Sequence, residues 1–395
     1  MKIIEKQKEF SIMQLIDRYN NDERQNKLNL TVGVYTDQSG CCPILDSVRE
    51  AEYYRAKNQI SKATFSLTGA SEYHEAVRNV LFPSMREYGI HHNIQVVQTL
   101  GASGALHLVS RLIKYNSPTA RIWISTPTWE NHPALLSDHS HNFGFYRYQP
   151  ANQEELCLDS VLEDLHSASP GDFVLLQACC HNPTGMDPDL SQWNRLADFC
   201  AERRLIPLFD FAYQGFAHSI EQDAALFDIF RDRLDKFLIC SSFSKNMGIY
   251  GERTGALTFV FRDEKELKDW INISKELIRS SYSTPPIHGS FIVSHIINDP
   301  IRFTNWQQEL TGISKDLQRR RTMFFSELTK AGIIDRVLPY RKQNGMFLCL
   351  DLSQEKINSL RENHGIYFLN SGRISIASLS ISNMPRFCEA LKDVV

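Results

Sequence analysis

Lys245 is the residue of this 395-residue chain whose position most clearly suggests covalent chemistry. It follows an apolar run, predicted to be a strand, in the sequence Ser-Phe-Ser-Lys-Asn (242–246). A lysine at a strand end above a cleft can lose its proton through desolvation, and its amine then becomes a nucleophile that forms Schiff bases. The alternative is an ordinary surface lysine, which is the commoner place for this residue type, so the surrounding sequence has to decide.

A phosphate site is predicted where Gly-Ala-Ser-Gly (101–104) opens an amphipathic helix directly after a strand. Free backbone amides at a helix start bind anions. The pattern is a weak signal alone, because two glycines are common in such turns and it is not the G-x-G-x-x-G of dinucleotide enzymes. Arg253, Ser103 and Ser242 would add a charge and hydroxyl donors to the same phosphate. A structural ion pair is the alternative for Arg253.

Asp210 ends a strand that is otherwise apolar, and this placement predicts a partner for its carboxylate. A partly desolvated carboxylate is costly unless it meets a cation or hydrogen-bond donors. The protonated ring nitrogen of a pyridine cofactor is such a partner, because the electron sink of pyridoxal chemistry needs that proton held in place. A helix-cap or turn aspartate is the alternative.

Aromatic and amide side chains follow two other predicted strands. Trp129 could stack on a planar cofactor. His132 and His181 could hydrogen-bond the Asp210 carboxylate, although core packing would explain either histidine and the tryptophan. Asn182-Pro183 predicts a tight turn, for which a cis peptide is one form, and this turn would aim the Asn182 amide inward.

These candidate residues follow β-rich runs that alternate with amphipathic helical stretches between about residues 94 and 261. The predicted strands are 94–99, 121–126, 143–148, 172–177, 205–210, 237–242 and 255–261. Because most lack polar alternation, we expect an α/β sheet buried under helices on both faces. Ligands of such sheets gather at the carboxyl ends of strands, where the candidates stand. After residue 261 the sequence predicts long charged helices and then a C-terminal α+β segment, which would form a smaller domain with about the first forty residues.

Length and composition narrow the class of protein. A chain of this length is too long for one compact core, so we expect two domains with a cleft between them. A net charge of -3 without a long charged run favours small-molecule partners and predicts neither nucleic acid nor membrane binding. Glu5 and Glu9 interrupt what a signal peptide would need, so we expect a cytoplasmic protein. The nine cysteines lack C-x-x-C spacing, which predicts reduced, mostly buried thiols and no metal site.

Together these segments resemble the aspartate and aromatic amino acid aminotransferases, a group of fold-type I enzymes that depend on pyridoxal 5′-phosphate (PLP), over almost the whole chain. The motifs that carry the resemblance are V-G-V-Y (32–35), Q-T-L-G-A-S-G-A-L (98–106), P-T-W-E-N-H (127–132), C-C-H-N-P-T-G (179–185), D-F-A-Y-Q-G-F (210–216), S-F-S-K-N (242–246), Y-G-E-R (250–253), S-Y-S-T-P-P (281–286), Q-N-G-M-F (343–347) and S-G-R (371–373). The resemblance implies a large PLP-binding domain (43–312) with a seven-stranded, mostly parallel sheet. It also implies a smaller α+β domain built from residues 1–42 and 313–395.

The resemblance also assigns roles residue by residue. Lys245 would form the Schiff base and move protons, Asp210 would bind the pyridine nitrogen, and Tyr213 would bind the phenolic oxygen. The other cofactor contacts implied are Asn182 at the phenolic oxygen, Trp129 over the ring, and Ala102, Ser103, Ser242 and Arg253 at the phosphate. The substrate contacts implied are Arg373 with Gly33, Asn182 and Trp129 at the α-carboxylate, and Arg279 of the partner subunit at a distal carboxylate. The family works as a homodimer with shared active sites, so the same is expected here.

The implied reaction is transamination between an L-amino acid and 2-oxoglutarate, in two half-reactions with ping-pong kinetics. A planar guanidinium is the best clamp for the carboxylate that amino acids and 2-oxo acids share. Arg279 favours dicarboxylates, and aromatic-selective relatives keep it too. Thr36 and Ala63 stand where aspartate-selective members carry lysine and asparagine, whereas Val34 looks aspartate-like. We therefore expect a broad aromatic and dicarboxylic specificity.

Three positions depart from the family pattern. Thr64 replaces a tyrosine that reaches the partner's phosphate, Ser378 replaces a glycine, and Asn370 replaces a small residue. Two alternative functions stay open: another fold-type I PLP reaction, such as a lyase or a decarboxylase, and a PLP-binding protein without turnover. Arg373 together with Arg279 argues against a lyase, because a transaminase must accept dicarboxylic partners. Retention of the cofactor residues argues against a protein without turnover, and Thr64 argues for it.

Overall fold

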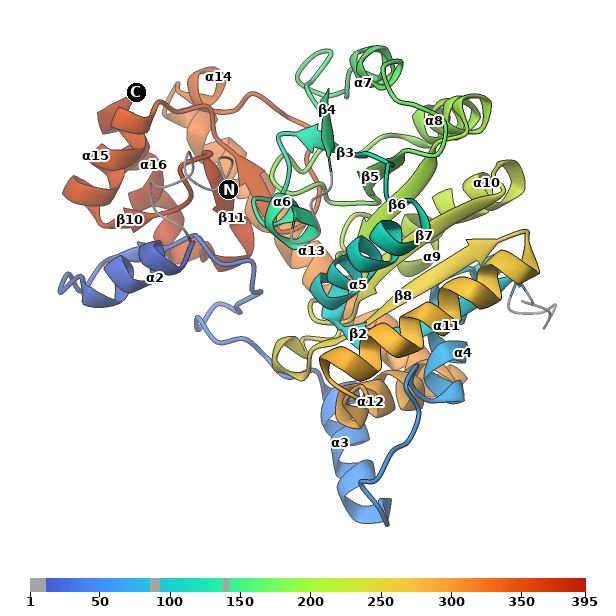
Figure 1. Ribbon diagram of the computed structural model, residues 1–395. Coiled ribbons are helices and arrows are strands. Elements are labelled where there is room, and N and C mark those ends of the chain that lie inside the picture. The colour runs from blue at the N-terminus through green and yellow to red at the C-terminus, as the bar shows by residue number, and fades with distance from the viewer. Residues whose placement is uncertain (1–11, 86–92, 138–141) are drawn as a thin grey trace.

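A central sheet of seven strands forms the core of the computed structural model, which describes residues 12–85, 93–137 and 142–395 (Figure 1). The prediction made from Glu5 and Glu9 lies outside the described residues. In spatial order the strands are β2 (Ile94–Leu100), β8 (Thr254–Phe261), β7 (Lys236–Ser242), β6 (Ile206–Phe211), β5 (Phe173–Gln177), β3 (Ile122–Thr126) and β4 (Phe143–Arg147). β8 is antiparallel to both neighbours and the other pairs are parallel. All seven predicted strands and the mostly parallel sheet are confirmed.

The register of the central strands brings their carboxyl ends to one edge. Gln177 of β5 pairs with Asp210 of β6, and Asp210 in turn pairs with Cys240 of β7. Ser242, at the end of β7, pairs with Gly255 near the start of the antiparallel β8. The loops that follow β5, β6 and β7 therefore leave the sheet side by side, which places their polar residues in one region.

Helices cover both faces of this sheet, and strand residues alternate between the two cores. Leu208 packs in the core with α5 (Gly101–Asn116), α6 (His132–Ser137) and α11 (Glu264–Ser281). Phe209 points the other way, into a core that includes α4 (Ser71–Leu81), α7 (Leu158–Leu165), α8 (Leu190–Arg203), α9 (Ile220–Ala224) and α10 (Leu226–Arg233). Its ring meets Phe227 and Phe230 edge to face. The strands are thus buried on both sides, as their apolar sequences predict.

Local sequence signals explain where several helices begin. α8 has a capping box in which Asp189 and Gln192 bind each other's backbone amides. α13 (Pro300–Lys330), the long helix predicted after residue 261, starts with Asp299 as N-cap and a proline in its first turn. α5 opens at Gly101, as predicted from the glycine-rich turn.

The C-terminal part of the chain is a smaller α+β assembly that also includes the N-terminal segment (Figure 1). Its elements are α2 (Ile12–Asn21), β1 (Leu28–Asn29), α14 (Ile334–Val337), β9 (Phe347–Cys349), α15 (Gln354–His364), β10 (Ile366–Tyr367), β11 (Arg373–Ser375) and α16 (Met384–Val394). The remaining elements are α3 (Asp46–Asn58), α12 (Ile287–Ile297) and the short 3-10 turns η1 (Pro83–Met85), η2 (Tyr250–Glu252), η3 (Ile376–Ser378) and η4 (Ile381–Asn383). β1 pairs with β10 in parallel, so residues far apart in sequence share one small sheet.

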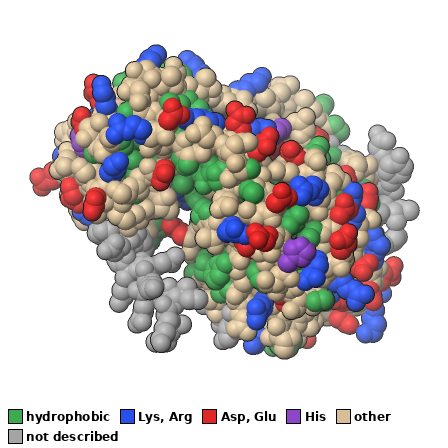
Figure 2. Space-filling view, turned by 90° about the horizontal axis from the view of Figure 1, so that it is seen from above, with side chains coloured by type: hydrophobic (Ala, Val, Ile, Leu, Met, Phe, Trp, Pro, Cys, Tyr) green, Lys and Arg blue, Asp and Glu red, His purple; other side chains and the backbone are tan. Residues whose placement is uncertain are grey.

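α13 joins the two parts of the molecule. Near its start the Trp306 indole donates a hydrogen bond to the carbonyl of Asn246, beside the end of β7. Near its end Phe324 stacks on Phe387 of α16. Seen from above, apolar side chains gather in a hollow between the two parts (Figure 2). Across the described ranges, no helix is both long enough and apolar enough to cross a membrane.

Candidate active site

Lys245 lies in the turn after β7, with its ammonium nitrogen 4.8 Å from the centre of the Tyr213 ring. Burial lowers the pKa of Lys245 to about 8. The Asp210 carboxylate opposes this shift, whereas the Arg253 and Arg373 guanidinium groups add to it. Three charged residues from three different segments therefore act on this amine. Roughly a tenth of the amine is then neutral at pH 7, far more than for an ordinary lysine, as nucleophilic or general-base chemistry requires.

Asp210 is buried at the end of β6, and within the described part of the chain only one of its two carboxylate oxygens has a hydrogen-bond partner. Its Oδ2 accepts a hydrogen bond of 2.9 Å from Nε2 of His132. The other ring nitrogen of His132 contacts the Thr128 hydroxyl at 2.7 Å, so the imidazole is fixed from both sides. Asp210 Oδ1 is buried with no hydrogen-bond partner among the described residues. An unpaired buried carboxylate oxygen fits a protonated pyridine nitrogen, which is the partner the sequence predicts.

The two predicted histidines differ in what they contact. His132 contacts Asp210 as predicted. The Trp129 ring packs edge to face against the His132 ring, with ring centres 5.2 Å apart. His181 instead hydrogen-bonds the hydroxyls of Ser125 and Thr184. Burial lowers the pKa of His181 to about 3, so it is neutral and supports the loop from within.

The predicted phosphate residues meet where β7, β8 and α5 come together. The Arg253 guanidinium donates to the Ser244 hydroxyl at 3.3 Å, and the Ser242 and Ser244 hydroxyls lie 3.0 Å apart. Gly101, just before Ala102 and Ser103, has a φ of +69°, and a Cβ there would lie 2.6 Å from Arg253 Nη2. Only glycine allows the helix start to approach the arginine this closely. Ser244 carried no predicted role, although it belongs to the same motif as Lys245.

Arg373 begins β11 and is 3% exposed. Its Nη1 donates to the Asn182 side-chain oxygen at 3.1 Å, and its Nη2 donates to the Thr31 carbonyl at 2.6 Å. Its Nε is buried without a partner among the described residues, and burial lowers its pKa. The guanidinium centre lies 4.3 Å from the Phe347 ring centre. A buried cation held by neutral oxygens has the capacity to bind an anionic ligand such as a carboxylate.

Phe347 is a residue that the sequence quoted in a motif but gave no role. Its ring contacts the Arg373 guanidinium, and a Cβ added at Gly33 would lie 2.4 Å from the same ring. It also meets the Tyr213 ring edge to face at 5.9 Å between centres. Phe347 thus forms a wall shared by the residues predicted to hold cofactor and substrate. Only the presence of Q-N-G-M-F among the motifs that carry the resemblance pointed toward the site.

The loop that carries Asn182 is fixed by its own backbone contacts. The Asn182-Pro183 peptide is cis, as the sequence allowed, and Thr126-Pro127 is a second cis peptide that was not predicted. Asp187 accepts hydrogen bonds from the backbone amides of Cys180 and His181, and the Asn344 side-chain amide donates to it at 3.2 Å. This half-buried carboxylate, which the sequence analysis missed, therefore fastens the Asn182 loop to the segment that carries Phe347.

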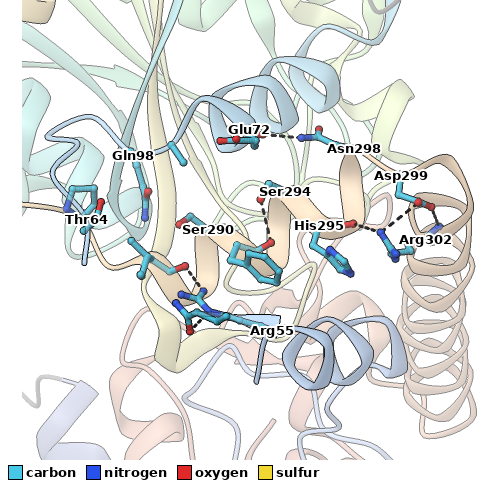
Figure 3. A pocket seen from close by; sticks show the side chains of 16 residues that line it. Arg55, Thr64, Glu72, Gln98, Ser290, Ser294, His295, Asn298, Asp299 and Arg302 are labelled. Atoms are coloured by element: carbon cyan, nitrogen blue, oxygen red, sulfur yellow. Dashed lines mark hydrogen bonds and ion pairs between the residues drawn. The ribbon is translucent and has the colours of Figure 1, made fainter. Parts of the chain in front are cut away.

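Two predicted site residues lie away from this cluster. Arg279 is exposed near the end of α11. Thr64 lines a separate cavity of about 590 Å³ between α3, α4 and α12 (Figure 3). In that cavity Arg55 donates a hydrogen bond to a backbone carbonyl of α12. On another wall the Asn298 side-chain amide donates to the backbone carbonyl of Glu72. The single chain brings neither residue to the cofactor site.

Comparison with known proteins decides the family. Residues 25–391 match the family model for aminotransferase class I and II. The chain belongs to this family. It is 37% identical to an aspartate aminotransferase of Escherichia coli (strain K12), with 97% of both chains covered. It is 34% identical to an aromatic-amino-acid aminotransferase of Pseudomonas aeruginosa, covering 97% of this chain and 96% of the relative.

The structural comparison agrees with the sequence comparison. An aromatic-amino-acid aminotransferase from Burkholderia pseudomallei, covalently bound to pyridoxal phosphate, superimposes with a TM-score of 0.90 at 34% identity and 98% coverage of both chains. The predicted aminotransferase activity, the PLP cofactor and the fold-type I architecture are therefore confirmed. The residues at this aminotransferase site fit PLP, because an unpaired Asp210 oxygen, a partly neutral Lys245 and a glycine-lined cradle beside Arg253 occur together.

Proposed function

We propose that this aminotransferase moves the amino group between aspartate or an aromatic L-amino acid and 2-oxoglutarate. The observation that carries the proposal is the pairing of a low-pKa lysine with a buried guanidinium in one site: Lys245 can move a proton, and Arg373 can bind a carboxylate. The relatives named for aspartate and for aromatic amino acids both match over nearly the whole chain, which supports a broad specificity.

Most residues of the site would hold the cofactor. PLP, when bound, supplies an electron sink that stabilises negative charge at the substrate α-carbon. Asp210, held by His132, would keep the pyridine nitrogen protonated. The residues proposed to hold the rest of the cofactor are Trp129, Asn182 and Tyr213 at the ring and Ala102, Ser103, Ser242 and Arg253 at the phosphate. Burial raises the pKa of the Tyr213 hydroxyl, so it stays protonated and can donate a hydrogen bond to the phenolic oxygen.

Lys245 would serve as the acid and base of the reaction. Its neutral amine would accept a proton from the substrate α-carbon, and the resulting ammonium would return a proton to the cofactor's C4′ carbon. A pKa of about 8 suits both directions, because neither form is strongly disfavoured near neutral pH. The nearby positive charges of Arg253 and Arg373 help to release the proton again.

Arg373 would bind the α-carboxylate. Its Nε lacks a partner among the described residues, and its outer nitrogens are held only by neutral oxygens of Asn182 and Thr31. A carboxylate would complete this coordination and supply the missing negative charge. A Cβ added at Gly33 would lie 2.4 Å from the Phe347 ring, so the Gly33 backbone borders the same pocket.

The proposal includes a cytoplasmic homodimer with shared active sites, in which Arg279 of the partner subunit meets a distal carboxylate. Exposed apolar side chains along and after α3, at Tyr53, Ile60 and Phe65, support such an interface. Arg279 is exposed at the end of a helix, so it is available to another subunit.

All nine cysteines are free thiols and five are buried, which is compatible with a reducing compartment. The division into residues 43–312 and the two flanking segments stays part of the proposal.

The test mixes PLP-loaded protein with L-aspartate and, separately, with L-phenylalanine, and follows the cofactor absorbance and the 2-oxo acid released. We expect both amino acids to react, and Lys245→Ala to abolish the release of 2-oxo acid. Lys236→Ala, at the other end of β7, is the matched control and should leave the rate unchanged. Release of 2-oxo acid by neither amino acid, despite tight PLP binding, would favour a protein without turnover.

A further inference from the structure

Residues 31–36, which we call the strap, have no regular secondary structure, yet almost every one of them is held by a specific contact. The strap follows β1 and carries Gly33 against the Phe347 ring. A Cβ at position 33 would lie 2.4 Å from that ring, so the strap is seated as closely as a glycine permits. An irregular segment this close to a binding site needs partners outside its own backbone.

Two buried arginines hold the ends of the strap. Arg373 Nη2 donates to the Thr31 carbonyl at 2.6 Å. At the other end, Arg320 Nη2 donates to the Thr36 carbonyl at 2.7 Å. Arg320 is fully buried and pairs with Asp316 at 2.6 Å, so its position is fixed by charge as well as by packing.

The middle of the strap is held by one hydroxyl. Ser378 Oγ lies 3.1 Å from the Val32 carbonyl and 3.4 Å from the Val34 carbonyl, the two carbonyls on either side of Gly33. Ser378 Oγ also points its donor at the Ser375 hydroxyl, 3.1 Å away, so its single proton is shared between the two strap carbonyls and this hydroxyl. Ser378 ends η3, which directly follows β11. The short stretch that carries Arg373 therefore also carries the hydroxyl that holds the strap.

We propose that Ser378 is a positioning residue that seats Gly33 on Phe347 and thereby forms the substrate-carboxylate pocket before substrate arrives. The Phe347 ring contacts both the strap, at Gly33, and the Arg373 guanidinium, so a strap that lifts removes one of the contacts that hold the ring beside the guanidinium. A pocket formed in advance spares the substrate the cost of ordering it. The identity of the substrate rests on the proposed function, whereas the seating of the strap does not.

The experiment compares Ser378→Ala with Ser382→Ala, a matched control whose exposed hydroxyl contacts that of Ser380. Hydrogen exchange is followed in the full chain without substrate, at the amides of Tyr35 and Thr36, which bond to Tyr250 and Ala377. Loss of one hydrogen bond predicts exchange about fivefold faster in Ser378→Ala. Ser378→Thr, which keeps the hydroxyl, should restore the slow exchange.

Kinetics supply the second arm. In Ser378→Ala the KM values for aspartate and for phenylalanine should rise together by about fivefold, with kcat changed less than about twofold, because uniform substrate binding is lost. PLP affinity should stay unchanged. Unchanged exchange at Tyr35 and Thr36 overturns the proposal whatever the kinetics show. Faster exchange with unchanged KM overturns the positioning role. Because exchange is measured without substrate, it decides the seating of the strap even for a protein that proves inactive.

Discussion

The two anion sites of the molecule are built in different ways. The phosphate end is made by neighbouring elements of one sheet, and its arginine, Arg253, is exposed in the single chain. The carboxylate end is assembled from segments far apart in sequence, and its arginine, Arg373, is buried against Asn182, Thr31 and Phe347. At the phosphate end, Arg253 is desolvated only when a ligand or a partner subunit covers it. The buried end has already borne the cost of ordering and desolvation, so changes there should affect function more.

The largest effect is expected at the buried end. Arg373→Ala should lower kcat/KM for every amino acid by roughly a thousandfold, because about 4 kcal/mol is lost when a desolvated charge loses its ionic partner. Steady-state kinetics with aspartate and phenylalanine measure it, and Arg319→Ala, an exposed arginine on α13, is the control. A loss below about tenfold would mean that the carboxylate binds elsewhere.

Arg253→Ala should act on the cofactor. Removing one charge-assisted contact of about 2 kcal/mol should raise the Kd of PLP roughly thirtyfold, while kcat at saturating PLP changes little. Titration of the cofactor-free protein with PLP gives the Kd. If kcat falls as far as it does in Arg373→Ala, the contrast between an open and a prebuilt end is wrong.

Arg279 extends the comparison to a third guanidinium, which is exposed in the single chain. Arg279→Ala should weaken kcat/KM for aspartate by about tenfold more than for phenylalanine, because only aspartate has a distal carboxylate to lose its partner. The ratio of the two kcat/KM values is the measurement, and Arg262→Ala, on the loop before α11, is the control. Equal losses for the two amino acids would remove Arg279 from the substrate site.

The smallest effect is a change in pH dependence. The Lys245 pKa is lowered to about 8, so its neutral amine increases as pH rises toward that value and PLP should attach faster, levelling off above it. Both arginines contribute to the lowering, so Arg253→Ala and Arg373→Ala should each move this midpoint upward, Arg253→Ala by the larger amount. Stopped-flow absorbance of PLP binding at a series of pH values tests this order. A downward shift in either variant would contradict it.

The sequence was sufficient for features that depend on local pattern. The apolar runs predicted all seven strands, and the glycine-rich turn predicted the start of α5. Asp210, at the end of its apolar strand, was recognised by the cost of burying a lone carboxylate, and its bond to His132 is confirmed. Such signals are visible because they arise from neighbouring residues along one chain segment.

Non-local contacts could not be read in this way. Phe347 is an ordinary apolar residue in sequence, and its contacts with Gly33 and Arg373 depend on how three distant segments pack. Asp187 gives no local hint that it will accept two amides of the Asn182 loop. His181 has the same residue type as His132 and a similar position after a strand, yet it supports its own loop. Packing between segments decides each of these cases.

The contact between Arg373 and Asn182 determines which way round the Asn182 amide lies. A guanidinium can only donate hydrogen bonds, so the atom of Asn182 facing it must be the oxygen, and the amide nitrogen must face elsewhere. Arg373 thus fixes the orientation of the Asn182 amide, and the amide nitrogen of Asn182 is left as a donor for the cofactor's phenolic oxygen, which it is proposed to meet. Asn182 therefore couples the substrate-carboxylate site to the cofactor site, because any ligand that draws Arg373 away from Asn182 also frees the Asn182 amide to rotate.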